Sequence, residues 1–147
     1  MTKKEHTEDL RLQRVHGITL AERREREKQQ DNKCAICGRP PVTRGLHTDH
    51  DHRLAYTKIK VNKISNGKFV AHIGSELAFP VLFQTGNTKK EARQKVKQLL
   101  KKISVRGLLC SRCNRGLQFF SDDPVRLAQA AQYIADYKSD RFDKYGI

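Results

Sequence analysis

The chain has 147 residues, enough to bury one ordinary core, or one small core with an inserted unit. It carries 30 Lys and Arg against 16 Asp and Glu, a formal net charge of +14 that attracts polyanions. A solubilising surface rarely needs so large an imbalance, so nucleic acid is the predicted partner.

Neither a secretion signal nor a membrane span is predicted. The N-terminus, MTKKEHTEDLRLQ, lacks an apolar core, and the longest apolar run, LAFPVLF at 77–83, is too short to cross a bilayer. We therefore expect a soluble, cytoplasmic protein.

The first element predicted in chain order is a helix over 20–30, LAERREREKQQ. Thr19 can cap this helix, and its Glu and Arg residues can pair three or four positions apart. We predict that it packs against the rest of the fold and carries no chemistry.

The four cysteines form two CxxC pairs, Cys34 with Cys37 and Cys110 with Cys113. In a reducing cytosol such cysteines are more often metal ligands than disulfides, and two pairs complete a closed, structural zinc site. A redox dithiol would need one pair beside a βαβ pattern, and inert buried cysteines would have no reason to adopt this spacing. We predict a structural zinc ion that clips 34–54 to 105–120 and contributes much of the folding free energy.

Residues 47–52 read HTDHDH and hold three of the six histidines. Histidine and aspartate both bind metals, and an ordinary histidine pKa of about 6.5 also suits proton transfer. The pattern by itself fits a transition-metal site, a catalytic site or a crowded polar loop. In an extended stretch Asp51 would point away from His50 and His52, which favours a structural role for Asp51.

The zinc clip has a consequence for this histidine-rich segment. Asn114 directly follows Cys113, so a zinc ion would fix the direction of its amide. The clip can therefore bring Asn114 close to Asp49 and His50, although these residues are far apart in the chain.

Most of the basic charge lies between the two cysteine pairs, because residues 55–104 contain 11 basic and 2 acidic residues. Alternating apolar residues predict strands within 56–64 and 68–73, and Asn66-Gly67 between them is a strong hairpin signal. The stretch ELAFPVLFQ at 76–84 predicts a third strand, and Pro80 favours a place at the sheet edge.

A basic amphipathic helix is predicted after Thr88, which forms a capping-box pattern with Glu91. Apolar residues at helical spacing mark its core face: Ala92, Val96, Leu99, Leu100 and Ile103. The rest of its surface is basic and consists largely of Lys89, Lys90, Arg93, Lys95, Lys97, Lys101 and Lys102. We predict phosphate contacts for Lys89, Lys90, Arg93 and Lys97, with a merely solvated face as the alternative.

Near the C-terminus, Asp123 and Pro124 are a favourable N-cap and first residue for a helix, VRLAQAAQYIADYK at 125–138. Apolar residues mark one side of it: Leu127, Ala131 and Ile134. We predict a second packing helix here.

Together, QDNKCAICGRPP, LHTDHDHR, VRGLLCSRCNRGL and DDPVRLAQAAQYI resemble the HNH (ββα-metal) nucleases of the phage recombination endonuclease VII family. In that family zinc knuckles flank an Asp-His-Asp-His hairpin, and an Asn follows the last cysteine. The resemblance covers about 10–53 and 105–138, includes the turn HGIT at 16–19, and leaves the basic insertion outside.

The resemblance implies an α+β fold in which a zinc-clipped ββα-metal core with flanking helices carries an inserted module. The core would be a discontinuous HNH domain over 1–54 and 105–147. The module would be a basic β-hairpin or sheet plus helix over 55–104, which we expect to contact DNA.

The resemblance also implies that Asp49 and Asn114 hold a catalytic divalent ion, Mg²⁺ or Mn²⁺, and that His50 is the general base. A carboxylate and an amide oxygen bind a hard cation and leave room for water and phosphate oxygens. A neutral imidazole can accept a proton from the attacking water near neutral pH. The implied products carry a 5′-phosphate and a 3′-hydroxyl, and His52 is expected to assist by binding the scissile phosphate or the metal.

Further residues near the implied site have less defined roles. Arg106, Arg112 and Arg115 are candidate phosphate contacts. His47 is expected to be a surface histidine, with a supporting contact to the site as the alternative. Some relatives place another carboxylate shortly after the Asn, where this chain has RGLQ at 115–118, so a third metal ligand is not identified.

The leading functional prediction is a Mg²⁺-dependent, zinc-stabilised endonuclease that cuts branched DNA such as Holliday junctions, typically as a homodimer. The basic insertion gives weight to a nicking or homing-type enzyme that cuts linear duplex at preferred sites. A non-catalytic zinc-ribbon DNA-binding protein would account for the charge and the cysteines. It would leave Asp49, His50 and Asn114 unexplained.

Overall fold

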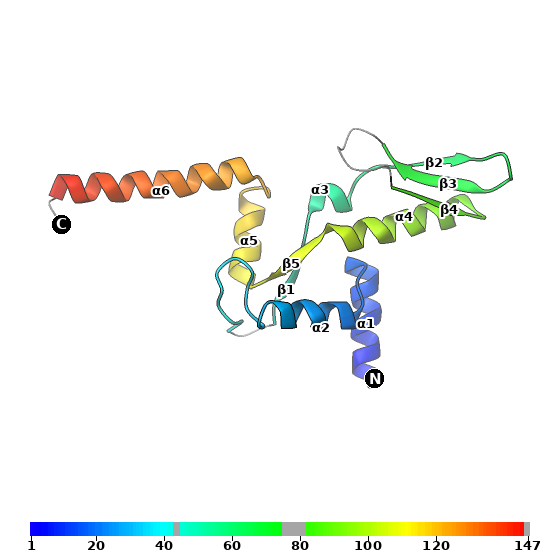
Figure 1. Ribbon diagram of the computed structural model, residues 1–147, viewed down its shortest axis with the longest axis horizontal. Coiled ribbons are helices and arrows are strands. Elements are labelled where there is room, and N and C mark those ends of the chain that lie inside the picture. Colours follow the sequence, from blue (N-terminus) through cyan, green and yellow to red (C-terminus); the bar gives the residue numbers. More distant parts are fainter. Residues whose placement is uncertain (43–44, 75–81, 146–147) are drawn as a thin grey trace.

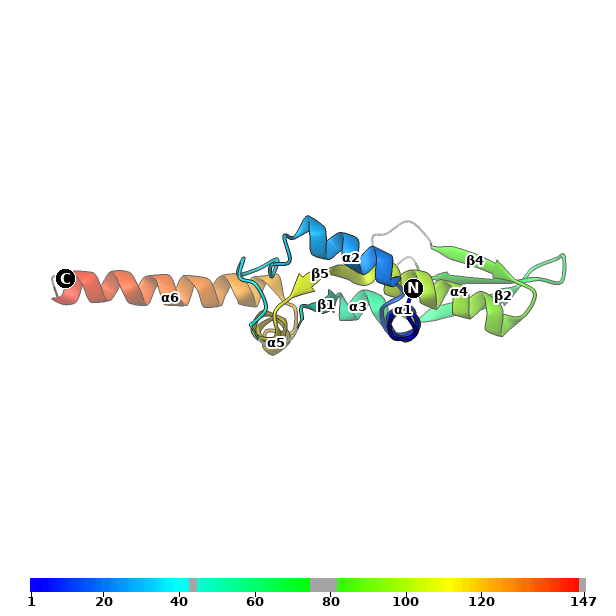
Figure 2. The ribbon, with the colours of Figure 1, turned by 90° about the horizontal axis from the view of Figure 1, so that it is seen from below.

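The computed structural model describes residues 1–42, 45–74 and 82–145, with side chains described up to residue 137. It is an elongated α+β molecule (Figures 1 and 2). A three-stranded sheet lies at one end, a long C-terminal helix projects from the other, and a two-stranded sheet lies in the body between them.

Two helices open the chain, α1 (Lys3–His16) and α2 (Leu20–Gln29), and each begins with a complete capping box. The helix predicted after Thr19 is confirmed. Helix α1 was not predicted, although Thr2 and Glu5 carry the same capping signal. α1 ends at Gly17, which adopts a left-handed conformation with φ 73° and turns the chain into α2.

The central sheet pairs β1 (His47–His50) with β5 (Val105–Leu109) in antiparallel register. α5 (Ser111–Phe119) follows β5 after a single residue and contacts both strands. A small core fills this unit, in which the buried residues are Cys34, Leu46, Leu108 and Leu109. Segments separated by more than fifty residues thus form a strand–strand–helix unit in the middle of the molecule.

The chain turns away directly after β1. We expected an extended stretch through His52, but the strand ends at His50 and His52 is the first residue of the short helix α3 (His52–Ala55). The extended prediction is wrong because Asp51 caps this helix, accepting hydrogen bonds from the backbone N–H groups of Arg53 (2.9 Å) and Leu54 (3.2 Å). Asp51 has a structural role, as predicted, and it fulfils this role by capping α3.

The inserted segment forms an antiparallel sheet of β2 (Ile59–Lys63), β3 (Phe69–Ile73) and β4 (Phe83–Gly86), in the order β2-β3-β4. The hairpin predicted at Asn66-Gly67 is confirmed, but its loop is longer than the two residues expected, since the backbone N–H of Ile64 donates to the Lys68 carbonyl (2.9 Å). Gly67 takes a positive φ of 80° in this loop. Residues 75–81, with Pro80 and most of the stretch predicted as the third strand, lie outside the described residues. β4 begins after them and lies at a sheet edge.

α4 (Lys89–Ser104) packs against all three strands of the inserted sheet and then continues directly into β5 (Figure 1). The Thr88 hydroxyl caps it as predicted, while the Glu91 carboxylate accepts a hydrogen bond from the backbone N–H of Asn87 (2.8 Å) instead of that of Thr88. Its core face buries Ala92, Val96 and Leu100 against Ala71 and Ile73 of β3. Ile103, predicted as part of this stripe, is 44% exposed because the end of α4 extends past the sheet.

The last helix, α6 (Pro124–Tyr145), starts as predicted, with the Asp123 carboxylate accepting a hydrogen bond from the backbone N–H of Val125 (2.9 Å). The prediction that it packs along an apolar side is wrong. The turn before it, at Ser121 and Asp122, has positive φ values and directs the helix away from the body (Figure 1). Consequently Ile134 is 55% exposed and Tyr133 is 75% exposed.

Candidate functional site

The four cysteines gather at one end of the central unit. Cys34 and Cys37 lie in the loop after α2, while Cys110 precedes α5 and Cys113 lies in its first turn. Their four sulfur atoms all lie within 4.8 Å of one another, and those of Cys37 and Cys110 are 3.9 Å apart. A tetrahedral zinc ion with Zn–S bonds of about 2.3 Å would set the sulfur atoms about 3.8 Å apart. The cluster therefore has the donors and the spacing to hold zinc.

The electrostatics of the cluster also suit a cation. Burial raises the pKa of the Cys34 thiol, but the backbone N–H groups of Cys37, Cys110 and Ile36 outweigh burial and lower this pKa to about 6. Burial and the neighbouring cysteines raise the pKa of Cys113 to about 12. The Cys34 thiolate is thus stabilised, while ionisation of Cys113 beside it is unfavourable. Four thiolates together therefore require a cation to neutralise them.

Asp49 lies on β1 opposite Gly107 and is buried. Both of its carboxylate oxygens accept hydrogen bonds from Arg106 of β5, one from Nε at 2.8 Å and one from Nη2 at 2.9 Å. The same Nη2 donates to the Asp122 carboxylate at 3.1 Å. Burial opposes the charge on Arg106, but the hydrogen bonds to Asp49 are the larger effect and raise the pKa of Arg106. Arg106 therefore joins β1, β5 and the turn before α6 through one charged network.

His50 ends β1, where a bulge interrupts the pairing with β5, and its ring lies in a group of three imidazoles. The His52 ring stacks on it with centroids 4.5 Å apart and an interplanar angle of 11°. The His16 ring, from the end of α1, approaches edge-on at 5.6 Å. Burial, and then His52, lower the pKa of His50, while Asp49 raises it. Burial is also the main reason that the pKa of His16 falls to about 4.

A cavity of about 40 Å³ adjoins His50, room for a water molecule. Its lining comes from α1, α3, α4 and the end of β1: Val15, His16, His50, Ala55, Tyr56, Lys97, Lys101 and Ser104. The candidate base thus faces an enclosed space that is built from segments distant in the chain.

The remaining predicted site residues are less tightly placed. Asn114 is half-buried in the first turn of α5, where its backbone N–H donates to the Cys110 carbonyl (3.0 Å). Among the described residues its side chain makes no hydrogen bond, so the structure puts it on the same unit as Asp49 without a hydrogen bond between the two side chains. Arg112 and Arg115 of α5 are exposed. His47 is half-buried instead of lying on the surface as predicted, because its strand packs in the central unit.

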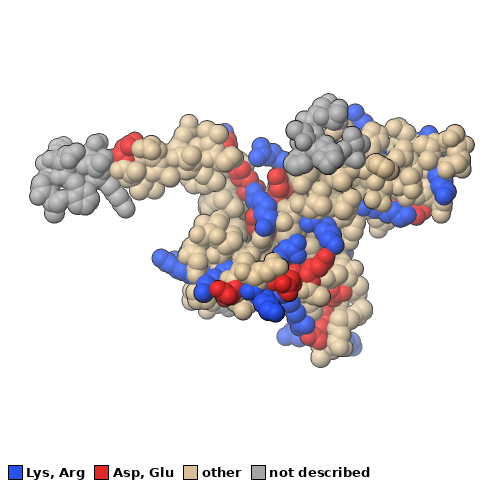
Figure 3. Space-filling view, viewed as in Figure 1, with Lys and Arg blue, Asp and Glu red and all other residues tan. Residues whose placement is uncertain are grey.

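The predicted DNA-contacting residues of the insertion, Lys89, Lys90, Arg93 and Lys97, are all exposed on α4. Figure 3 shows Lys and Arg side chains along the edge formed by α4, and a mixture of acidic and basic side chains over α1 and α2.

Four residues that support the site were not predicted from the sequence. His16 contacts His50, and Asp122 shares Arg106 with Asp49. The Gln30 side chain exchanges two hydrogen bonds of 2.9 Å with the backbone of Leu108 and so fixes the outer edge of β5. Arg23 of α2 donates to the Thr48 hydroxyl (3.0 Å) and to the Leu46 carbonyl (2.7 Å). Three of the four lie within motifs that carry the resemblance, since His16 is in HGIT, Gln30 begins QDNKCAICGRPP and Asp122 begins DDPVRLAQAAQYI, whereas Arg23 lies outside these motifs.

These features define an α+β protein with a four-cysteine cluster that could hold zinc and with a group of histidine and aspartate side chains at the end of β1. The chain belongs to the recombination endonuclease VII family, whose model matches residues 9–136. The match confirms the resemblance carried by the motifs, and its span includes the inserted segment as well as both cysteine pairs. Comparison with curated proteins and with solved structures gives no match.

An endonuclease acts on nucleic acid, so membership of this family accounts for the formal net charge of +14. In the part of the chain that the structure describes, no helix is both long enough and apolar enough to cross a membrane.

Proposed function

We propose that this protein is a metal-dependent DNA endonuclease whose HNH-type core consists of β1, β5 and α5. The observation that carries the proposal is the setting of His50. Its imidazole adjoins a small cavity and stacks on His52, next in the chain to a buried carboxylate. A non-catalytic zinc-ribbon protein would need none of these features.

In this proposal His50 accepts the proton of the attacking water. Because burial lowers its pKa, the imidazole is neutral at neutral pH and its free nitrogen can act as a base. The stacked His52 limits the orientations that the His50 ring can adopt, and its own exposed ring can reach a phosphate oxygen. His16 closes the other side of the space and, with its pKa near 4, adds no positive charge at neutral pH.

Two metal sites with separate roles follow from the donor atoms. The four cysteines would hold zinc as a structural ion, because a four-thiolate site has no open position for water. The oxygen donors of Asp49 and Asn114 suit a hard cation, Mg²⁺ or Mn²⁺. When bound, that ion supplies positive charge that stabilises the phosphate in the transition state. The products would carry a 5′-phosphate and a 3′-hydroxyl.

Arg106 fits this arrangement as the residue that orients the Asp49 carboxylate. Both oxygens of Asp49 bind Arg106 in the structure, so a cation has to share or replace one of these contacts. Asp122 gives Arg106 a second carboxylate partner, so the guanidinium stays paired if Asp49 turns an oxygen away.

The proposed substrate is branched DNA of the Holliday-junction type. Cutting opposed strands of a junction requires two active sites, so we propose a homodimer. The core would span 1–54 and 105–147 and perform the cleavage. The insert 55–104 would contribute DNA contacts through Lys89, Lys90, Arg93 and Lys97, and Arg112 and Arg115 of α5 would contact phosphates near the cut.

The proposal is tested by incubating the protein with a synthetic four-way junction, a linear duplex of the same arms and a supercoiled plasmid, with Mg²⁺ and with EDTA. We expect cleavage only with Mg²⁺, preference for the junction, and a loss of about 10²-fold or more in His50→Ala, the usual size of a general-base contribution. His6→Ala, which changes an exposed histidine of α1, serves as the control and should cut like the wild type.

Failure of the wild-type protein to cut any of these substrates with any divalent ion would reject the nuclease. Cleavage that survives His50→Ala would reject the assigned base. Equal cleavage of junction and linear duplex would favour the nicking or homing-type alternative over a junction-resolving enzyme.

A further inference from the structure

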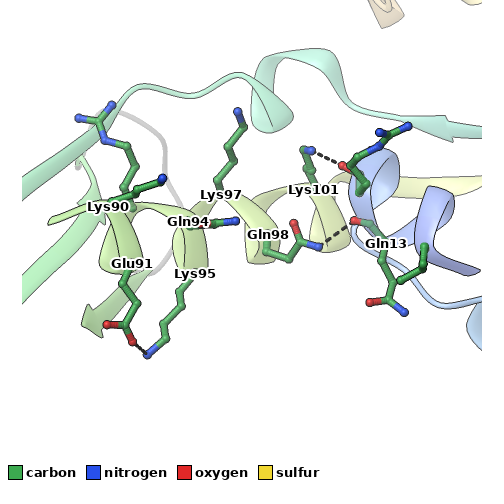
Figure 4. Close-up of a pocket in the computed structure, with 11 residues that line it drawn as sticks. Gln13, Lys90, Glu91, Gln94, Lys95, Lys97, Gln98 and Lys101 are labelled. Atoms are coloured by element: carbon green, nitrogen blue, oxygen red, sulfur yellow. Dashed lines mark hydrogen bonds and ion pairs between the residues drawn. The ribbon is translucent and has the colours of Figure 1, made fainter. Parts of the chain in front are cut away.

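A groove of about 850 Å³ runs between α1 and α4, on the opposite side of α4 from its packing against the inserted sheet. Leu10, Gln13 and Arg14 of α1 form one wall, and α4 forms the other (Figure 4). Two contacts bridge the walls: Gln98 Nε2 donates to the Gln13 carbonyl (2.8 Å), and Lys101 Nζ donates to the Arg14 carbonyl. The groove is therefore a product of tertiary packing between the N-terminal helix and the inserted helix.

Among the residues that the structure describes, the groove is lined by six cations and by a single carboxylate, that of Glu91. The Glu91 carboxylate is already paired with Lys95 at 2.8 Å, and both side chains point away from the side to which Lys97 and Lys101 point (Figure 4). The acidic residues of α1 do not line the groove: Glu5 pairs with Arg24, Glu8 pairs with Arg11, and Asp9 accepts hydrogen bonds from the backbone N–H of Leu20 and from Gln13 Nε2 (both 2.6 Å). The groove thus has an unbalanced positive charge.

Four of the groove cations lie in a row along α4 at helical spacing: Lys90, Arg93, Lys97 and Lys101. Within the described ranges none of these four side chains forms an ion pair, whereas Lys95 and Lys102 on other faces of the helix do. Burial, followed by repulsion from Lys97 and Arg14, lowers the pKa of Lys101. These cations would gain from an external anion. A solvated lysine face spreads its charges apart and has no such mutual repulsion.

The groove also leads to the candidate base. Lys97 and Lys101 line both the groove and the cavity that adjoins His50. The row from Lys90 to Lys101 is about 16 Å long at 1.5 Å per residue. One DNA strand carries about five phosphates over such a length, at about 3.4 Å of helix axis each.

We propose that the groove between α1 and α4 binds the phosphate backbone of the DNA strand that runs outward from the bond cut beside His50. Arg14 contributes from one wall, and Lys97 and Lys101 contribute from the other. The inference rests on the proposed nuclease function and deepens it, because it assigns the N-terminal helix and the inserted helix to a single DNA-binding surface.

The test compares two variants that each remove two positive charges. Arg14→Gln/Lys97→Gln changes one residue of each wall, whereas the control Lys63→Gln/Lys68→Gln changes exposed lysines of the β2–β3 hairpin. Binding to a fluorescently labelled four-way junction and to a linear duplex is measured by anisotropy at several salt concentrations, without added Mg²⁺ so that the DNA stays intact. Thermal midpoints are compared to show that both variants fold.

For the groove variant we expect about tenfold weaker DNA binding and a slope of log Kd against log salt that is lower by about two, because each lost phosphate contact removes about 0.9. The hairpin control should keep the wild-type slope. Equal slopes and affinities for the wild type and the groove variant would overturn the proposal. A variant that binds duplex RNA more weakly but binds DNA like the wild type would also overturn the proposal.

The binding comparison is independent of cleavage, so the two proposals fail separately. Unchanged cleavage in His50→Ala would remove the assigned base and leave the binding result standing. Unchanged binding in Arg14→Gln/Lys97→Gln, together with loss of cleavage in His50→Ala, would reject the DNA-binding groove and support the nuclease.

Discussion

Asp49 and His50 are neighbours in the chain, yet their side chains have different surroundings. Successive residues of a strand point to opposite faces, and here the bulge between the two separates them further. Asp49 is held by the guanidinium of Arg106, which binds both carboxylate oxygens. His50 lies among two other imidazoles, and burial keeps it neutral. One dipeptide can thus supply an anionic ligand and a neutral base.

His16 shows how the surroundings of the imidazole group affect stability. Burial lowers its pKa to about 4, whereas the ring titrates near 6.5 in an unfolded chain. As the pH falls below 6.5 the unfolded state binds the proton first, so the contribution of His16 to stability decreases between about pH 6.5 and pH 4. This loss should disappear in His16→Phe, which keeps an aromatic ring and removes a buried, unpartnered Nδ1.

Chemical denaturation at pH 7.5 and pH 5.5 measures the effect. We expect the free energy of unfolding of the wild type to fall more than that of His16→Phe, by at most about 1 kcal/mol because the ring is only half-buried. His6→Phe, at an exposed position of α1, should behave like the wild type. Equal losses in the wild type and in His16→Phe would show that the pKa of His16 is not lowered by folding.

At the scale of elements, the packing of α1 against α4 depends on Gly17. This residue has a positive φ, and a Cβ atom there would lie 2.8 Å from both the carbonyl oxygen of Gln98 and the backbone nitrogen of Lys102. Both neighbours are backbone atoms, so the two helices would have to separate. The groove wall and the position of His16, one residue earlier, both depend on this approach.

Gly17→Ala should therefore destabilise the protein by about 3 kcal/mol, from the left-handed backbone strain and the overpacking together. Gly67→Ala has the same backbone strain at φ 80° but no atom within 4 Å, and should cost only about 1–2 kcal/mol. Denaturant unfolding of both variants gives the comparison. A loss at Gly17 no larger than the loss at Gly67 would mean that α1 does not pack closely on α4.

Elements with local start and turn signals were the ones that could be predicted. The caps at Thr19 and Thr88 and the Asn66-Gly67 turn all act within a few residues, and all three are confirmed. The failures concern packing. Ile103 and Ile134 carry the correct helical spacing but stay about half exposed, because α4 extends past the sheet and α6 leaves the body.

At the scale of the whole molecule, most of the buried hydrophobic residues that the structure describes belong to one of two separate clusters. One joins β3 to α4 within the insertion, and the other surrounds the cysteines in the central unit. The second cluster is small and includes Cys34 among its buried residues. Its stability should therefore depend on the metal more than that of the first cluster does.

Cys110→Ser should abolish stoichiometric zinc binding and unfold the central unit, while much of the inserted sheet and α4 keeps its structure. Metal analysis and hydrogen exchange check this, with protection expected to disappear from β1, β5 and α5 and to remain in β3 and α4. Ser111→Ala, at an exposed neighbouring position, is the matched control. A metal-free Cys110→Ser protein with wild-type protection throughout would contradict a structural role for zinc.

The sequence by itself determined the family, the two CxxC motifs and the candidate residues Asp49 and His50, because these depend on residue types at short, specific spacings. Only the tertiary structure decided that Arg106 binds Asp49, that His16 faces His50 and that α1 and α4 enclose a basic groove. These contacts join residues separated by tens of positions in the chain. Their formation depends on how whole elements pack, and no local pattern of charge or hydrophobicity encodes that packing.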